Sequence, residues 1–257
     1  MPAAEGALAP HDWIAGLEKG LHLIEAFDAA HPRLTATEMG ARCGMTRTAA
    51  RRYLKTLAHL GYVGTDGKLY WLMPRILRLG HAYIESARLP RLVQPVLQRI
   101  TSGTEEIAYL GVLDGDDTIF IARSGLQRHT ASGYMPGTRM PAQVTAAGMV
   151  ILACGEEAAM DEWLQVHELR SFTSFTLASK QVLREKLMAF KHQGWAVSEQ
   201  QLELNFRGIA VPLLDRKNVV HGAISLTMPI NREETDHALN RILPVLQEAA
   251  RSLRPLL

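Results

Sequence analysis

Six side chains between positions 46 and 55 are suited to contacts with a polyanion, because each is basic or carries a hydroxyl group. They are Thr46, Arg47, Thr48, Arg51, Arg52 and Lys55. In a helix, the arginines and the lysine fall opposite an apolar stripe that includes Leu54 and Leu57. The stretch 39–65 holds five Lys or Arg and no Asp or Glu. An ordinary solvated face usually mixes both signs, so this pattern favours a helix that lies in a DNA groove.

A second group of residues is suited to holding a small anion at the start of a helix. The predicted loop 132–144 brings Arg139, Met140 and Pro141 to a helix that begins after Thr145. The first turn of that helix is Ala146-Ala147-Gly148, which is small enough for a ligand to approach the backbone. The free N–H groups and partial positive charge of a helix N-terminus attract a carboxylate. A helix cap that only packs against a sheet is the alternative, and the residues alone leave both open.

The motifs of common enzymes are absent from the sequence. There is no G-x-S-x-G nucleophile elbow, no glycine-rich phosphate loop and no H-E-x-x-H zinc motif. The ten histidines show no metal-ligand spacing. Asp114, Asp116 and Asp117 favour a turn, and no downstream glutamate completes a calcium loop. We therefore expect no catalytic residue, no metal site and no cofactor.

The basic stretch lies within a predicted helix-turn-helix. Thr35 and Glu38 have the spacing of a capping box, and Gly44 can end the helix that they start. A second helix runs from about Arg47 to Leu60, and an amphipathic helix at 14–29 precedes the pair. After Gly61, two short apolar stretches flank an Asp-Gly turn, which predicts a hairpin. Three helices followed by a hairpin indicate a winged helix-turn-helix.

The rest of the chain predicts a linker helix and a mixed body. Pro74 opens a helix that ends before Pro90, and its wide apolar side suggests packing against a second subunit. The predicted strands cover residues 106–113, 118–123, 128–132, 195–199, 207–215 and 219–228. The predicted helices cover residues 91–103, 145–153, 156–166, 179–192 and 232–253. We expect Pro244 to kink the last of these. The fold class is α+β, with a mostly antiparallel sheet and packed helices.

The distribution of charge agrees with a basic N-terminal part, the head, followed by a nearly neutral remainder, the body. The chain has 257 residues, 47% of them hydrophobic, and a net charge of +2. Residues 1–88 hold 11 Lys or Arg against 8 Asp or Glu, whereas the remainder holds 17 against 18. No secretory signal or membrane-spanning run is found, and the two cysteines do not form a predicted disulfide pair. We therefore expect a cytoplasmic protein.

Two segments resemble a known family. They are GTRMPAQVTAAGMVILA, at 137–153, and GWAVSEQQLELNFRGIAVPLLD, at 194–215. With the two-domain plan, they resemble the IclR family of bacterial transcription regulators over about residues 14–255. The segment from Glu203 to Pro212 is most similar to the branch that senses aromatic acids of the protocatechuate and 4-hydroxybenzoate type. The resemblance implies a winged helix-turn-helix, a GAF-like effector domain, palindromic operators, and dimers or dimers of dimers.

The resemblance also implies an effector pocket. By position, it falls on His129, Met140, Ala146, Ala147, Ser198, Phe206, Gly208, Ser225 and Thr227. Ser225 and Thr227 alternate on one face of a strand, as a pocket wall requires. The sequence departs from the family at Met149, where a Lys or Arg is common, and at Ser198, where an acidic residue is frequent.

These observations predict a cytoplasmic DNA-binding regulator that senses a small organic acid, with an aromatic acid favoured. Its expected parts are a DNA-binding head at 1–75, a linker helix at 76–89 and an effector-binding body at 90–257. Two alternatives remain. In the first, the chain binds DNA and its body acts only in oligomerisation. In the second, the chain is an enzyme that acts on small carboxylates.

Overall fold

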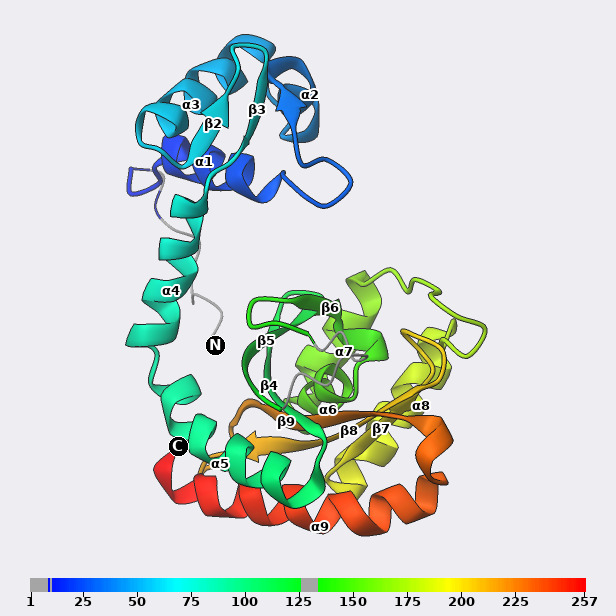
Figure 1. Cartoon of the computed structure of the whole chain (residues 1–257). Helices are drawn as coiled ribbons and strands as arrows, with labels where there is room; N and C mark the ends of the chain where they lie inside the picture. The colour runs from blue at the N-terminus through cyan, green and yellow to red at the C-terminus, as the bar shows by residue number, and fades with distance from the viewer. Residues whose placement is uncertain (1–8, 10, 126–133) are drawn as a thin grey trace. The chain divides into compact units, whose positions relative to one another are not determined.

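The chain divides into two compact units, one ending at Tyr83 and the other spanning Ile84–Leu257. The computed structural model describes residue 9 and residues 11–125 and 134–257 (Figure 1). The boundary between the units lies within the linker helix predicted at 76–89. None of the described helices has the length and apolar character needed to cross a membrane.

The first unit is built on three short helices and a small sheet. The helices are α1 (Ala15–Glu25), α2 (Ala36–Arg42) and α3 (Arg47–His59), and the strands are β1 (Leu34–Thr35), β2 (Val63–Thr65) and β3 (Leu69–Leu72). The predicted capping box is present. The N–H of Glu38 donates to Thr35 Oγ1 at 3.3 Å, and the N–H of Thr35 donates to the Glu38 carboxylate at 2.7 Å. Gly44, with φ of 64°, provides the predicted turn between α2 and α3.

The wing has one strand more than the sequence predicted. Leu34 and Thr35 pair with Tyr70 and Leu69 of β3, so the order of the sheet is β1-β3-β2. A two-residue strand leaves no periodic pattern in the sequence, which is why it was not predicted. The buried side chains of this unit form one cluster between the helices and the sheet. They are Leu23, Leu34, Ala36, Met39, Ala50, Leu54, Val63 and Tyr70.

The segment after the wing contains two helices whose boundary differs from the prediction. A short 3-10 turn (Pro74–Ile76) leads into α4 (Leu77–Ser86), and α5 covers Arg88–Thr104. Ala87 separates the two in an extended conformation, three residues before the predicted end at Pro90. Pro90 lies in the first turn of α5, where a helix does not need the N–H that proline lacks.

The second unit has a six-stranded antiparallel sheet. Its strands are β4 (Ile107–Asp114), β5 (Asp117–Ser124), β6 (Arg139–Pro141), β7 (Ala196–Glu199), β8 (Phe206–Leu214) and β9 (Val220–Pro229). They are ordered β6-β5-β4-β9-β8-β7, with every pair antiparallel. The strand predicted at 128–132 lies outside the described residues. β6 lies in the segment that was predicted to be a loop.

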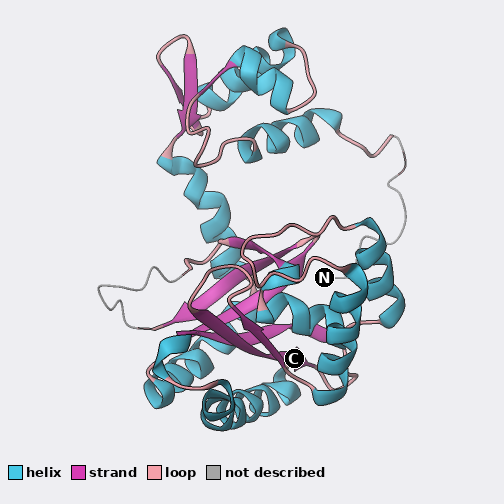
Figure 2. Ribbon diagram, turned by 90° about the vertical axis from the view of Figure 1, so that its right-hand side faces the viewer, coloured by secondary structure: helices cyan, strands magenta, loops and turns pink. Residues whose placement is uncertain are grey.

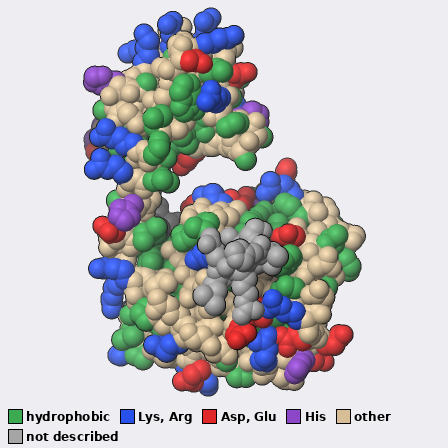
Figure 3. Space-filling model, viewed as in Figure 1, with side chains coloured by type: hydrophobic (Ala, Val, Ile, Leu, Met, Phe, Trp, Pro, Cys, Tyr) green, Lys and Arg blue, Asp and Glu red, His purple; other side chains and the backbone are tan. Residues whose placement is uncertain are grey.

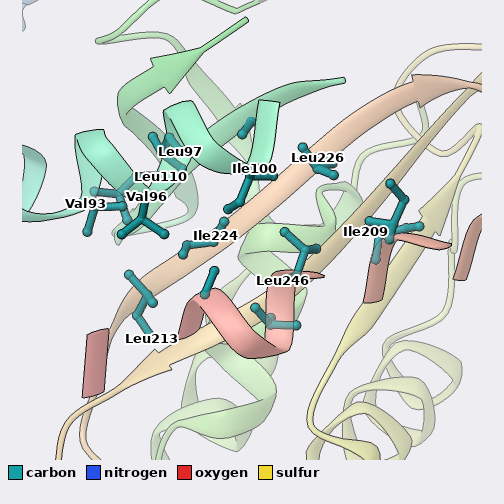
Figure 4. Close-up of a cluster of buried hydrophobic side chains, with 14 of the residues drawn as sticks. Val93, Val96, Leu97, Ile100, Leu110, Ile209, Leu213, Ile224, Leu226 and Leu246 are labelled. Atoms are coloured by element: carbon teal, nitrogen blue, oxygen red, sulfur yellow. The ribbon is translucent and has the colours of Figure 1, made fainter. Parts of the chain in front are cut away.

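Helices cover both faces of this sheet (Figure 2). Helices α5 and α9 (Thr235–Leu253) pack on one face. Helices α6 (Ala146–Cys154), α7 (Glu157–Val166) and α8 (Lys180–Gln193) form the layer on the other. Figure 4 shows the first interface, where Val93 and Leu97 of α5 meet Ile224 of β9 and Leu246 of α9. The structure assigns α9 as one helix across Pro244, the position at which a kink was predicted.

Candidate functional site

The six predicted polyanion-binding residues all lie in α3 or at its cap, and all are exposed. Thr46 caps the helix, because its Oγ1 accepts a hydrogen bond from the N–H of Ala49 at 3.2 Å. Ala50 and Leu54 are fully buried on the opposite side. Helix α3 is therefore anchored by one face and presents the other, with Thr46, Arg47, Thr48, Arg51, Arg52 and Lys55, to solvent. Figure 3 shows Lys and Arg side chains along the upper edge of this unit.

The second predicted site begins at the N-terminus of α6. Thr145 Oγ1 accepts a hydrogen bond from the N–H of Gly148 at 3.0 Å and lies 3.0 Å from Thr118 Oγ1. These contacts hold the first turn against β5. The N–H groups of Ala146 and Ala147 precede the intrahelical hydrogen-bond pattern, so they are donors available to a ligand. Ala146 to Ala153 are all buried, so α6 has no charged or solvated face.

A small cavity opens at this helix end and is partly open to solvent. Seven of the nine predicted pocket residues line it. They are Ala146, Ala147, Ser198, Phe206, Gly208, Ser225 and Thr227. The strand order explains the grouping, because β7, β8 and β9 are neighbours and Gly208 pairs with both Ser198 and Thr227. Ser198, Gly208 and Thr227 therefore lie side by side on three neighbouring strands and form a continuous floor below the helix end.

Gly208 and Ser198 shape that floor. A methyl group at Gly208 would lie 3.4 Å from Cβ of Ala146 and 3.9 Å from its nitrogen, so the glycine leaves space directly below the helix end. Ser198 Oγ donates to the carbonyl of Val144 at 2.6 Å. This bond ties β7 to the residues that lead into α6. Because the hydroxyl proton is used in this way, Ser198 meets a ligand as an acceptor.

Two residues predicted at this site, Met140 and Arg139, do not line the cavity, and the prediction for a third, His129, is not tested. Met140 lies in β6 opposite Thr118 and packs against the core under α6. His129 is outside the described residues. Arg139 was expected to reach the helix start, but its guanidinium bonds Asp114 at 2.8 Å and Asp117 at 3.1 Å. The pairing of β6 with β5 is the reason, since it sets Arg139 beside the turn between β4 and β5.

The sequence prediction missed the aromatic side of the cavity. Phe120 of β5 and Tyr134 line it, and their rings stack with centroids 5.4 Å apart. Tyr109 of β4 lies beside both rings. Burial, together with the charge of Glu203, raises the pKa of Tyr134 to about 12, so its hydroxyl stays protonated at neutral pH. One aromatic residue in each of β4 and β5 was visible in the sequence, but which face of the sheet it lined was not.

The loop between β7 and β8 supplies further lining residues that were not predicted. Gln200, Gln201 and Glu203 contribute from this loop, and Arg207 from the start of β8. Burial of Gln201 is the signal that the loop is part of the site and not a solvated connection. Among the residues that the structure describes, no group of three His, Cys, Asp or Glu is placed to hold a metal ion.

Comparison with known proteins identifies the family. A model of the bacterial transcriptional regulator IclR C-terminal domain matches residues 81–254, and one of the IclR helix-turn-helix domain matches residues 16–67. The chain belongs to the IclR family of bacterial transcriptional regulators. It is therefore a DNA-binding regulator and not an enzyme, and the enzyme alternative is set aside.

Relatives within the family match almost the whole chain. A Pca operon regulatory protein from Acinetobacter baylyi is 37% identical over 250 residues, which are 96% of this chain and 90% of that protein. The p-hydroxybenzoate hydroxylase transcriptional activator of the same organism is 35% identical over 260 residues, or 99% and 96% of the two chains.

Solved structures show the same architecture. A transcriptional regulator from Rhodococcus superposes with a TM-score of 0.79 at 30% identity, over 94% of this chain and 97% of that one. The inducer-binding domain of PobR from Acinetobacter, a double mutant in complex with 3-hydroxybenzoic acid, has a TM-score of 0.63 at 28% identity. It covers 66% of this chain and the whole of that chain.

Proposed function

We propose that this regulator binds a palindromic operator through α3 and an aromatic carboxylic acid in the cavity below α6, and thereby controls catabolic genes. The DNA-binding part is the head at 1–75, followed by a linker helix at 76–89 and an effector-binding body at 90–257. It acts in the cytoplasm, where bacterial DNA lies. The convergence of seven predicted residues on one cavity at a helix N-terminus supports the effector site.

The chemistry of the cavity supports an aromatic acid. The N–H groups of Ala146 and Ala147 and the dipole of α6 stabilise a carboxylate. Phe120, Tyr134 and Phe206 provide apolar ring surface, and Ser225 and Thr227 provide hydroxyl groups. Such a mixture of apolar wall and few polar groups is typical of small-molecule sites. The relatives named for p-hydroxybenzoate and Pca regulation support the same ligand class.

The exposed surface of α3 supports operator binding. Thr46, Arg47 and Thr48 are at the end of the helix that enters a groove first, so we assign them to bases or nearby phosphates. Arg51 follows one turn later and is assigned to a base edge, whereas Arg52 and Lys55 are assigned to phosphates. All of them are exposed, and Thr46 and Arg47 open the helix.

Exposed apolar side chains support a homodimer or a dimer of dimers. Ile14, Leu17 and Leu21 have the spacing of one helix face at α1, and the first two are 69% and 61% exposed. Leu77 of α4 is 71% exposed. Contact with a second copy would cover these side chains, and a twofold pair of heads matches a palindromic operator. Sedimentation should then give a dimer or a tetramer instead of a 28.4 kDa monomer.

The decisive experiment measures ligand binding and DNA binding on the same variant. Gly208→Ala adds a methyl group at ordinary contact distance below the helix end, and Ser225→Ala removes a lining hydroxyl. Calorimetry should show that the double variant loses affinity for 4-hydroxybenzoate by more than tenfold, roughly the effect of two lost contacts. Its binding to DNA from upstream of its own gene should persist but no longer respond to the acid.

Ser102→Ala provides the control, since Ser102 is exposed on α5 and does not line the cavity. Acid binding of parent strength in the double variant would place the effector elsewhere. If no small organic acid binds the parent protein, the alternative that the body only oligomerises becomes the better account.

A further inference from the structure

Two residues of opposite charge are among those that line the cavity, Glu203 and Arg207. The guanidinium of Arg207 is already used. It is 3% exposed, contacts the carboxylate of Glu199, and donates to the carbonyl of Glu233 at 3.1 Å and to Thr235 Oγ1 at 2.8 Å. Gly208 faces α6, so its neighbour Arg207 points to the other face of the sheet, towards the start of α9. Arg207 is therefore a structural residue that does not neutralise a ligand.

Glu203 is in a different situation. It is exposed, and none of the ion pairs recorded among the described residues includes it. Arg139, the cation predicted for this region, is bonded to Asp114 and Asp117. Within the described lining, the cavity thus combines one carboxylate, from Glu203, with the partial positive charge of the α6 N-terminus.

The loop that carries Glu203 is held in place. Thr173 Oγ1 donates to the carbonyl of Gln200 at 2.5 Å, and Thr176 Oγ1 donates to the carbonyl of Gln201 at 2.6 Å. The two hydroxyl groups come from the segment before α8, so they fasten the chain three and two positions before Glu203. The backbone on the N-terminal side of Glu203 is consequently held at the rim of the cavity.

The positions along β8 separate the two charged features. Gly208 lies below the α6 N-terminus, and the strand begins two residues earlier at Phe206, about 7 Å away at the usual strand rise. Glu203 lies in the loop before this strand, three residues ahead of Phe206 in the chain. The rings of Phe120 and Tyr134 line the same cavity. A ligand whose carboxylate meets the helix end would direct its far end towards Glu203.

The electrostatics of Tyr134 agree with a position of Glu203 beside the cavity. The negative charge of Glu203 contributes, after burial, to the raised pKa of the Tyr134 phenol. A second anion at this end would be repelled by Glu203, whereas a hydroxyl or amino group would donate a hydrogen bond to its carboxylate.

We propose that Glu203 sets the chemical class of the effector, selecting an aromatic monocarboxylate with a hydrogen-bond donor on the far side of the ring and rejecting dicarboxylates. This inference rests on the proposed effector site. It assigns Glu203 as a specificity residue that contacts the ligand at the end opposite to Ala146 and Ala147.

The test compares three acids by calorimetry on the full chain at neutral pH: 4-hydroxybenzoate, benzoate and benzene-1,4-dicarboxylate. The parent protein should bind 4-hydroxybenzoate roughly tenfold or more tightly than benzoate, as expected for a hydrogen bond to a charged acceptor. Benzene-1,4-dicarboxylate should bind most weakly. In Glu203→Ala the preference for the hydroxyl group should disappear, while benzoate affinity stays within about twofold of the parent.

Glu203→Gln removes the charge but keeps an acceptor. It should raise affinity for the dicarboxylate by roughly tenfold, because like-charge repulsion is removed. Raising the salt concentration should reproduce part of this gain in the parent protein, since Glu203 is exposed. Glu162→Gln, on the exposed side of α7 and outside the cavity lining, is the matched control and should leave all three affinities unchanged.

An unchanged ranking of the three acids in both Glu203 variants would overturn this inference and leave the effector site intact. If none of the aromatic acids binds the parent protein, both this inference and the proposed effector class fail. Because Glu203 is exposed, its substitution is not expected to unfold the body, and circular dichroism of each variant verifies this.

Discussion

Helices α3 and α6 begin in the same way but present opposite kinds of surface. Thr46 accepts a hydrogen bond from the N–H of Ala49, and Thr145 accepts one from the N–H of Gly148, so both are threonine N-caps. The polar face of α3 is exposed, whereas eight of the nine residues of α6 are buried. An identical local signal therefore starts one helix that we propose acts through its side chains and another that we propose acts through its backbone.

The difference follows from what each helix has to reach. Phosphates and base edges lie in a groove, so α3 needs long basic side chains and an exposed face. The proposed effector enters the protein instead, so α6 needs alanine and glycine that let the ligand approach its N–H groups. The cap predicts where each helix starts, and the side chains of the first turn predict which kind of partner it accepts.

The largest effect should come from the first turn of α6. An added methyl group at Gly148 would lie 2.5 Å from the Cα and the oxygen of Ala142 and from Thr118 Oγ1. Gly148→Ala should therefore destabilise the body by about 3 kcal/mol in guanidinium unfolding. Gly103→Ala on α5, where the new methyl group has open space, should change stability by less than ~1 kcal/mol. Equal effects at both glycines would contradict the close packing of α6.

The next effect concerns the exposed face of α3. Arg51→Ala should weaken operator binding by about 1–3 kcal/mol if the side chain reaches a guanine edge. Arg52→Ala should instead weaken binding to all sequences alike and lower the salt dependence by about one charge. Fluorescence anisotropy with specific and random duplexes separates the two results. Parent-like operator affinity of the folded Arg51 variant would refute its placement.

The two caps should differ in strength although their geometry matches. Thr46→Ala removes one exposed hydrogen bond and should cost about 1 kcal/mol. Thr145→Ala should cost about 2 kcal/mol, because it also leaves the buried hydroxyl of Thr118 without this partner. Thermal unfolding of both variants measures the difference. A larger loss of stability in Thr46→Ala than in Thr145→Ala would show that burial does not strengthen the cap of α6.

The smallest expected effect is a difference in how the stability of the two units depends on pH. Hydrogen bonds from Thr35 lower the pKa of the Glu38 carboxyl group. The stabilisation of the folded state by the ionised carboxylate is therefore present above about pH 4.5 and is lost as the pH falls further. The stability difference between the parent and Glu38→Gln should therefore shrink in acid. The effect of Thr145→Ala should stay constant across the same range, since its cap contains no titrating group. Parallel pH profiles for the two variants would contradict this expectation.

Local signals account for what the sequence predicted well. The capping box of Thr35 and Glu38, the turn at Gly44 and the alternation of Ser225 and Thr227 each depend on residues within a few positions. The family resemblance added the grouping of β7, β8 and β9 around the helix end, which no local pattern contains.

Long-range pairing accounts for what was missed. Strand β6 has three residues, and its partner β5 lies about fifteen residues away or more, so no periodicity reveals it. The same pairing removed Arg139 and Met140 from the expected site. Tyr134 and Phe120 meet through ring stacking, which the sequence does not encode as spacing. The break at Ala87 was placed at Pro90 because proline ends a helix more often than it occupies the first turn.

Thr35 gives the first unit a mechanical property. It pairs with Leu69 in the wing and also caps α2 through its hydroxyl group. A displacement of the wing strand therefore pulls on the start of the helix-turn-helix, and a rotation of α2 strains the wing. We therefore expect the wing and α2 to move together, as one piece, when this unit docks on a duplex.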